Sequence, residues 1–188
     1  MLRNLSSIVI MIALVAPVVL PAQRLFTRDA KVFFDATSKN SPERIEATAK
    51  SGTLVVDVAT SRVEAAILVK SFLFEKSLMQ EHFNENYMES SKYPKATFKG
   101  KIDDPTKVNF SQDGTYNPTL SGDLTVHGVT KQVKVPVKIV VKGGKATATA
   151  TFSIVLTEYG IDIPSVVSDK LAKEAKITID ATLEPMKS

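Results

Sequence analysis

The segment Val133–Leu156 reads VKVPVKIVVKGGKATATATFSIVL and carries the clearest structural signal in the chain. Apolar residues occupy every second position on both sides of Gly143–Gly144, and lysines and threonines occupy most positions between them. This period of two places alternate side chains on opposite faces of a strand. Two adjacent glycines permit the positive φ angles of a tight hairpin turn. The segment therefore predicts an antiparallel hairpin with one apolar face and one face in water.

The same alternation recurs along the chain from Lys31 onward. It predicts further strands over 31–38, 43–49, 54–58, 62–72, 96–102, 120–126 and 177–183, so that the chain has eight or nine strands with the hairpin included. Turn-forming residues separate most of them, at Asn40–Pro42, Ser51–Gly52, Asp113–Gly114 and His127–Thr130. Many evenly spaced antiparallel strands favour a sandwich or a barrel. Pro136 cannot donate a hydrogen bond to a neighbouring strand, so it predicts an edge or a bulge.

Two segments depart from this period. Apolar residues recur at helical spacing between Leu78 and Met88, which predicts a short amphipathic helix over 76–88. Ser77 and Gln80 have the spacing of a capping box at its start. A second short helical stretch is expected at 165–174, after Pro164. We expect both helices to cover an end of the β-structure, the first of them as a candidate lid.

Composition excludes several classes of protein. The chain has 188 residues, of which 44% are hydrophobic, so it can form one domain with a sizeable core. Lys and Arg number 24 against 20 Asp and Glu, without a basic block, which argues against a nucleic-acid partner. The absence of Cys excludes disulfides, a thiol nucleophile, a thiolate zinc site and a lipid anchor on cysteine. Only two His residues are present, so we expect no multi-His metal site.

The N-terminus has the layout of a secretory signal peptide. Arg3 precedes the uncharged, largely apolar run Ile8–Leu20, and Ala22 offers a small residue for cleavage. The run is shorter than the roughly 20 apolar residues of a membrane-spanning helix. We therefore predict a signal peptide over 1–22 and a periplasmic or secreted domain over 23–188. Retention of the segment as an anchor is the alternative, because Leu20 fits poorly two positions before the cut.

Small residues on the apolar faces raise the question of what fills the interior. Ala146, Ala148 and Ala150 share a face with Phe152 and Ile154. A barrel of about eight strands is just wide enough to be filled by side chains or to hold one small ligand. Large residues opposite the alanines would fill the space, or a guest would occupy it. Because the walls are apolar, such a guest would be elongated and apolar, with its polar end at the mouth.

Four segments, in this order, resemble the YceI-like family of lipid- or polyisoprenoid-binding proteins. They are FLFEKSLMQEHFNENYM (72–88), KYPKATF (92–98) followed by Gly100, GDLTVHGVT (122–130) and YGIDIP (159–164). With the strand order, the resemblance covers about 30–184. It implies an all-β, lipocalin-like antiparallel barrel of about eight strands with one or two short covering helices. It also implies an exported protein that encloses a long isoprenoid or fatty-acyl chain, with no cofactor and no settled reaction. The segment around His82 and Asn84–Met88 departs from the family pattern, which leaves the guest's identity open.

We expect the ligand to contact apolar side chains from several strands and from the 76–88 helix. These side chains are Phe34, Phe72, Phe74, Met79, Phe83, Phe98, Leu124, Ala148, Ala150, Phe152, Ile154 and Tyr159. His82 is the candidate partner of a polar head group, against the alternative of a solvated surface histidine. His127 is expected to anchor its turn by bonding to the backbone.

The expected function is that of an exported carrier for a long apolar lipid, such as a polyisoprenoid, an isoprenoid quinone or a fatty-acyl derivative. One alternative is a lipid-modifying enzyme that uses Glu158, Asp162 or a His. The common catalytic motifs are missing from the sequence, so we expect no enzyme and name no catalytic residue. Another alternative is a filled barrel that binds a protein. Transient membrane contact and a homodimer remain open.

Overall fold

The computed structural model describes residues 24–186, and most of them lie in strands. The strands are β1 (Arg24–Thr37), β2 (Glu46–Asp57), β3 (Arg62–Leu68), β4 (Leu73–Phe74), β5 (Lys95–Ile102), β6 (Gly114–Tyr116), β7 (Thr119–Val126), β8 (Val129–Lys142), β9 (Lys145–Val155) and β10 (Leu171–Pro185). The helical elements are α1 (Ser77–His82), the π-helical turn η2 (Phe83–Tyr87) and the 3₁₀ turns η1 (Val69–Ser71), η3 (Pro105–Lys107), η4 (Leu156–Tyr159) and η5 (Ser165–Val167). The predicted signal peptide lies outside the described residues.

Eight of the strands form a closed antiparallel barrel. In spatial order they are β1, β2, β3, β5, β7, β8, β9 and β10, and β10 pairs with β1 to close the sheet. Each strand therefore pairs with the next barrel strand along the chain, as in an up-and-down barrel. The short strands β4 and β6 add to this sheet by pairing with β2 and β8. The predicted all-β barrel is confirmed.

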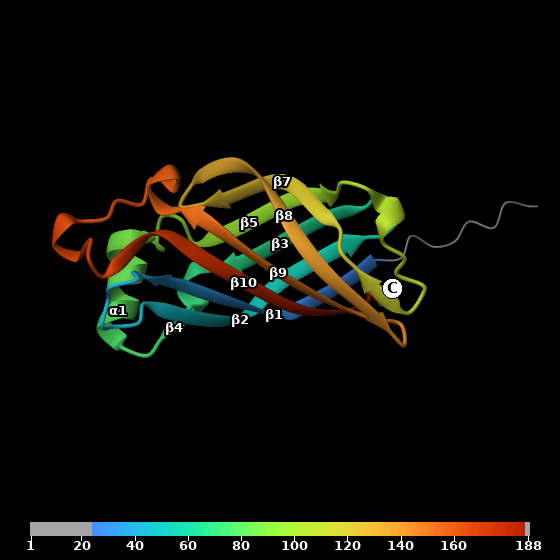
Figure 1. Ribbon diagram of the computed structural model, residues 1–188, viewed down its shortest axis with the longest axis horizontal. Helices are drawn as coiled ribbons and strands as arrows, with labels where there is room; N and C mark the ends of the chain where they lie inside the picture. The colour runs from blue at the N-terminus through green and yellow to red at the C-terminus, as the bar shows by residue number, and fades with distance from the viewer. Residues whose placement is uncertain (1–23, 187–188) are drawn as a thin grey trace, which may run out of the picture.

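The barrel is elongated, and its two ends differ (Figure 1). α1 and the segment 156–170 lie at one end, here called the helical end. The loop 103–113 and the β8–β9 turn lie at the other, here called the hairpin end. At that turn Gly143 and Gly144 have φ angles of 57° and 78°, as the predicted hairpin requires. No helix within 24–186 is long and apolar enough to span a membrane.

The core consists of two buried clusters that follow the barrel axis. The helical-end cluster includes Val69, Phe72, Phe83, Met88 and Tyr159. The hairpin-end cluster includes Leu25, Phe110, Ile139, Val141 and Leu183. Phe98, Val133, Phe152 and Ile179 pack against both clusters. Inward positions on alternate residues of every barrel strand thus form one continuous apolar interior.

The predicted turn at Ser51–Gly52 is wrong. Both residues lie inside β2, which joins the strands predicted at 43–49 and 54–58. Gly52 pairs with Ala30 between two register shifts in β1. A Cβ atom on Gly52 would lie 3.0 Å from the Ala30 carbonyl oxygen. Glycine therefore marks the close approach of two strands at a bulge here, and the chain does not reverse.

The helix predicted at 76–88 is confirmed as α1 with the π-helical turn that follows it, but its capping box is wrong. The N-cap is Lys76 in place of Ser77 and makes no side-chain capping hydrogen bond, and the side-chain Oε1 of Gln80 accepts from the Phe74 N–H at 3.3 Å. The helix predicted at 165–174 is wrong apart from η5. Leu171 is buried and already paired with Thr37, so strand pairing overrides the local helical pattern.

Candidate functional site

The barrel encloses a cavity of about 200 Å³. Among the residues that line it, Thr53 and Thr97 are the only polar ones, and no charged residue contributes. Lining residues extend over 133–139 of β8, 148–154 of β9 and 177–183 of β10. At about 3.3 Å per residue and the usual strand tilt, this corresponds to roughly 15 Å along the barrel axis. That length is comparable with the hydrocarbon depth of one membrane leaflet, about half of 30 Å.

Small side chains on the inner faces make room for the cavity. Ala148 and Ala150 line it, opposite Val137 and Ile139 in the ladder with β8. On the neighbouring wall Gly100 pairs directly with Gly122; neither lines the cavity, and the ring of the cavity residue Phe98 lies over Gly100. The interior is therefore not solid beside Ala148 and Ala150, although Ala146 in the same predicted row does not line the cavity, and this argues against the alternative of a filled barrel.

Most of the predicted ligand contacts lie where a guest in the cavity would meet them. These cavity-lining residues are Phe34, Phe72, Phe83, Phe98, Leu124, Ala148, Ala150, Phe152 and Ile154. They come from strands β1, β5, β7 and β9, from the segment after η1 and from the π-helical turn. Period-two alternation located the strand residues among them, because it states directly which side chains point inward.

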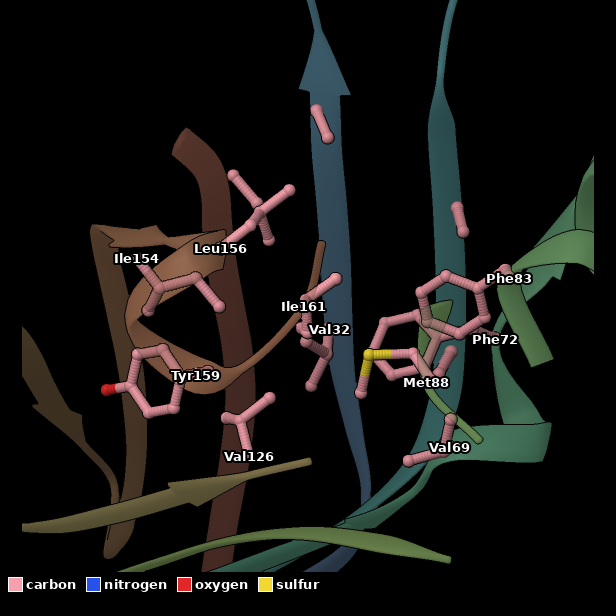
Figure 2. Close-up of a cluster of buried hydrophobic side chains, with 14 of the residues drawn as sticks. Val32, Val69, Phe72, Phe83, Met88, Val126, Ile154, Leu156, Tyr159 and Ile161 are labelled. Atoms are coloured by element: carbon pink, nitrogen blue, oxygen red, sulfur yellow. The ribbon is translucent and has the colours of Figure 1, made fainter. Parts of the chain in front are cut away.

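Phe74, Met79 and Tyr159 do not line the cavity. The Phe74 ring packs behind Phe83, with 4.9 Å between ring centroids. Met79 lies on an outer groove that Phe33 also lines. Tyr159 is buried in the helical-end cluster, but its hydroxyl points away from the other labelled side chains (Figure 2). Sequence spacing could not place these residues because none of them lies on a barrel strand.

His82, the predicted head-group partner, is exposed at the end of α1 and does not line the cavity. Its neighbour Phe83 is buried and does. Successive residues of a helix point about 100° apart, so adjacency in sequence did not place both side chains on the inner face. Glu158 and Asp162, the candidate catalytic carboxylates, are also exposed and outside the lining, and Glu158 pairs with Lys131 at 3.0 Å.

Aromatic rings close the cavity at the helical end. Phe34 lies 6.5 Å from Phe72 and 5.6 Å from Phe83 between ring centroids, in edge-on contacts. The Met88 N–H donates to the Phe83 carbonyl oxygen at 2.9 Å across the π-helical turn. This wider turn directs both Phe83 and Met88 into the cavity (Figure 2). Met88 was missed from sequence because a helix of ordinary pitch does not align residues five positions apart.

His127 joins three segments at the same end of the barrel. Its Nδ1–H donates to the Tyr159 carbonyl oxygen at 3.1 Å, and its Nε2 lies 2.9 Å from Oε2 of Glu89. The Tyr93 ring stands edge-on to the imidazole at 4.6 Å. The predicted anchoring role of His127 is therefore confirmed. The contact ties η4 and the segment after η2 to the β7–β8 turn.

Pro136 marks the position where the hydrogen-bonded pairing between β8 and β9 ends. The β8–β9 ladder runs from Lys142↔Lys145 only to Val137↔Ala150, whereas β8 pairs with β7 from Val129 to Pro136. The Val137 N–H donates to the Pro118 carbonyl oxygen on the β7 side, so position 136 faces β9, where proline has no N–H to donate. The ladder stops there. Beyond this point the strands separate toward the helical end (Figure 1).

Phe110 is a cavity residue that sequence analysis missed. It lies in the loop between β5 and β6, where the sequence shows no strand pattern, yet it is buried and lines the cavity. A lone aromatic residue in a polar stretch before the Asp113–Gly114 turn was the available signal.

Within 24–186 no group of three or more acidic, His or Cys side chains is arranged to hold a metal.

A family model described as the YceI-like domain matches residues 26–183. No match was found among curated proteins. Among solved structures, a polyisoprenoid-binding domain from Saccharophagus degradans, implicated in plant cell wall breakdown, shares 11% identity at a TM-score of 0.74. That comparison covers 88% of this chain and 99% of the other.

Two further solved structures have a similar fold. BcnA from Burkholderia cenocepacia shares 22% identity at a TM-score of 0.64, over 82% of this chain and 95% of the other. The YceI protein from Campylobacter jejuni shares 19% identity at a TM-score of 0.53, over 73% of this chain and 81% of the other. At these identities the structural comparisons support the barrel fold.

Proposed function

The chain belongs to the family of YceI-like domains, and on that premise we propose that it is an exported binding protein for one long apolar lipid chain held inside the barrel. The proposed ligand is a polyisoprenoid, an isoprenoid quinone or a fatty-acyl derivative. The related domain from Saccharophagus degradans is described as polyisoprenoid-binding, which favours the first class. The proposal is a carrier or storage role without catalysis.

The observation that carries this proposal is the chemistry of the cavity wall. All eight barrel strands contribute residues to this wall, and none of the lining residues is charged. Each buried methylene contributes about 0.8 kcal/mol, so ten of them give about 8 kcal/mol. That gain is comparable with the cost of association, roughly 4–15 kcal/mol, so a chain of ordinary lipid length is needed for firm binding.

Export is supported by the N-terminal sequence alone. The layout of residues 1–22 is that of a signal peptide, and a cysteine-free domain folds in an oxidising compartment without mispaired disulfides. A lipid chain is insoluble in water, so a protein that encloses it allows it to move between membranes. This is the role that the proposal assigns to the domain outside the cytoplasm.

Organic extraction of the purified protein followed by mass spectrometry tests the proposal. We expect one class of long-chain lipid at up to one molecule per protein. The variant Ala148→Phe places a ring in the cavity and should lose most of the bound lipid, whereas Thr147→Phe, at an exposed position on the outer face, should keep it. Extracts without lipid, together with failure to take up added fatty acids or prenols, would contradict the proposal.

A further inference from the structure

Phe110 enters the cavity from outside the barrel strands. Among residues 103–118, which connect β5 to β7, it is the one that lines the cavity, and only 9% of its surface is exposed. Its loop is fixed to the opposite hairpin, because the Gly143 N–H donates to Oδ1 of Asp113 at 2.9 Å. The ring is therefore held in place as part of the cavity wall.

The hairpin end is solidly packed behind this ring. Leu25, Val141 and Ala146 belong to the same buried cluster as Phe110, and each is 2% exposed. None of these three residues lines the cavity. The cavity therefore stops at the level of Phe110 and does not continue to solvent at this end.

The helical end is built differently. Short helical segments cover it, whereas the loop 103–113 and the β8–β9 turn lie at the hairpin end. Asn84, next to the cavity residue Phe83, has a buried Oδ1 atom with no hydrogen-bond partner among the described residues. At the hairpin end the residues lining the cavity are apolar, so a polar head group buried there would lose its hydrogen bonds. The residues that line the cavity at the helical end are apolar as well, so Asn84 is the feature that distinguishes the two ends: on the proposed function, the polar end of a lipid chain lies toward Asn84 and the apolar tail toward Phe110.

We propose that Phe110 is the stop for the tail of the bound chain and so determines the longest hydrocarbon that the barrel accepts. The inference rests on the proposed lipid-binding function and adds a residue that sets specificity within it. Once a hydrocarbon chain reaches the Phe110 ring, further carbons add no binding free energy, because they meet packed side chains. The length limit then depends on the size of the side chain at position 110.

Native mass spectrometry of the delipidated protein with an equimolar mixture of linear fatty acids measures this limit. Each methylene that finds cavity space strengthens binding by roughly fourfold, so occupancy rises with chain length up to the limit and then falls. In Phe110→Ala the most occupied length shifts upward by about two to four carbons, because the space of the ring is added to the cavity. In Phe110→Trp it shifts downward.

Phe33→Ala is the matched control, because Phe33 lines the outer groove and is absent from the cavity lining. It should leave the wild-type length distribution unchanged. If Phe110→Ala does not fold, Phe110→Leu is used in its place. It should shift the distribution of bound chain lengths in the same direction. Folded Phe110 variants with the wild-type distribution would overturn the inference while leaving lipid binding intact. A wild-type protein that takes up neither fatty acids nor linear prenols of any length would overturn the proposed function itself, and this inference with it.

Discussion

Nε2 of His127 lies 2.9 Å from Oε2 of Glu89, across 38 positions of sequence. The same imidazole bonds the Tyr159 carbonyl oxygen, so one side chain joins the β7–β8 turn to both segments that cover the helical end. His127 itself has a φ of 50°, in the left-handed region, and Gly128 follows with 76°. The turn thus points the ring at its partners.

Loss of this imidazole should loosen the helical end. His127→Ala is expected to lower the free energy of unfolding by about 1–3 kcal/mol, because it leaves partly buried hydrogen-bonding groups without a partner. Urea unfolding followed by circular dichroism measures the change. His82→Ala is the control, since that side chain is exposed, and it should cost about 0.5 kcal/mol or less. Equal effects of the two substitutions would contradict the anchoring role.

Stability should fall at alkaline pH through Tyr159. Burial raises the pKa of its phenol above the usual 10.0, and the nearby Glu158 carboxylate raises it further. The unfolded chain then loses this proton at a lower pH than the folded protein, so the stabilisation is complete below pH 10 and declines as pH rises above it. Urea unfolding across the alkaline range should show a shallower decline in Tyr159→Phe. An identical slope in both proteins would refute this assignment.

The glycine pair in the barrel wall should not tolerate a methyl group. A Cβ atom on Gly122 would lie 2.4 Å from both the Gly100 Cα and the Lys99 carbonyl oxygen. Gly122→Ala therefore forces β5 and β7 apart and should destabilise the protein by about 1–3 kcal/mol. Thr147→Ala, on the exposed face of β9, should change stability by about 0.5 kcal/mol or less. Thermal or urea unfolding distinguishes the two.

Amide hydrogen exchange should reveal the interrupted ladder between β8 and β9. By strand alternation the N–H groups of Lys134 and Ser153 face the stretch where these strands do not pair. They should exchange markedly faster than those of Lys138 and Thr149, which face each other within the ladder. Residue-resolved exchange measured by NMR tests this. Equal protection at all four positions would show that the strands remain paired in solution.

The mature protein should begin at Gln23. Expression of the full chain with export intact, followed by intact-mass measurement, should give a product without residues 1–22. Ala22→Leu, which removes the small residue at the cut, should accumulate the uncleaved chain. A wild-type product that keeps residues 1–22 would support the membrane-anchor alternative.

Local patterns located the barrel strands, although not the continuity of β2 or the short strands β4 and β6, and they located much of the cavity wall. Period-two alternation placed Phe98, Phe152 and Ile154 on inner faces, because a strand residue points to one side of the sheet or the other. Positions outside the strands had no such constraint. Met88 and Phe110 were missed, and Tyr159 was expected in the cavity but lies beside it.

The alternation of side chains and the paired glycines were enough to specify antiparallel strands, since both act between near neighbours in the chain, but they left a sandwich and a barrel open. The cavity and its ends depend on residues far apart in sequence. Phe110 closes one end only because its loop folds over the strands, and Phe83 closes the other only because a π-helical turn directs it inward. Contacts between segments far apart in the chain leave no local sequence pattern. The shape and length of the cavity were therefore decided by the tertiary structure alone.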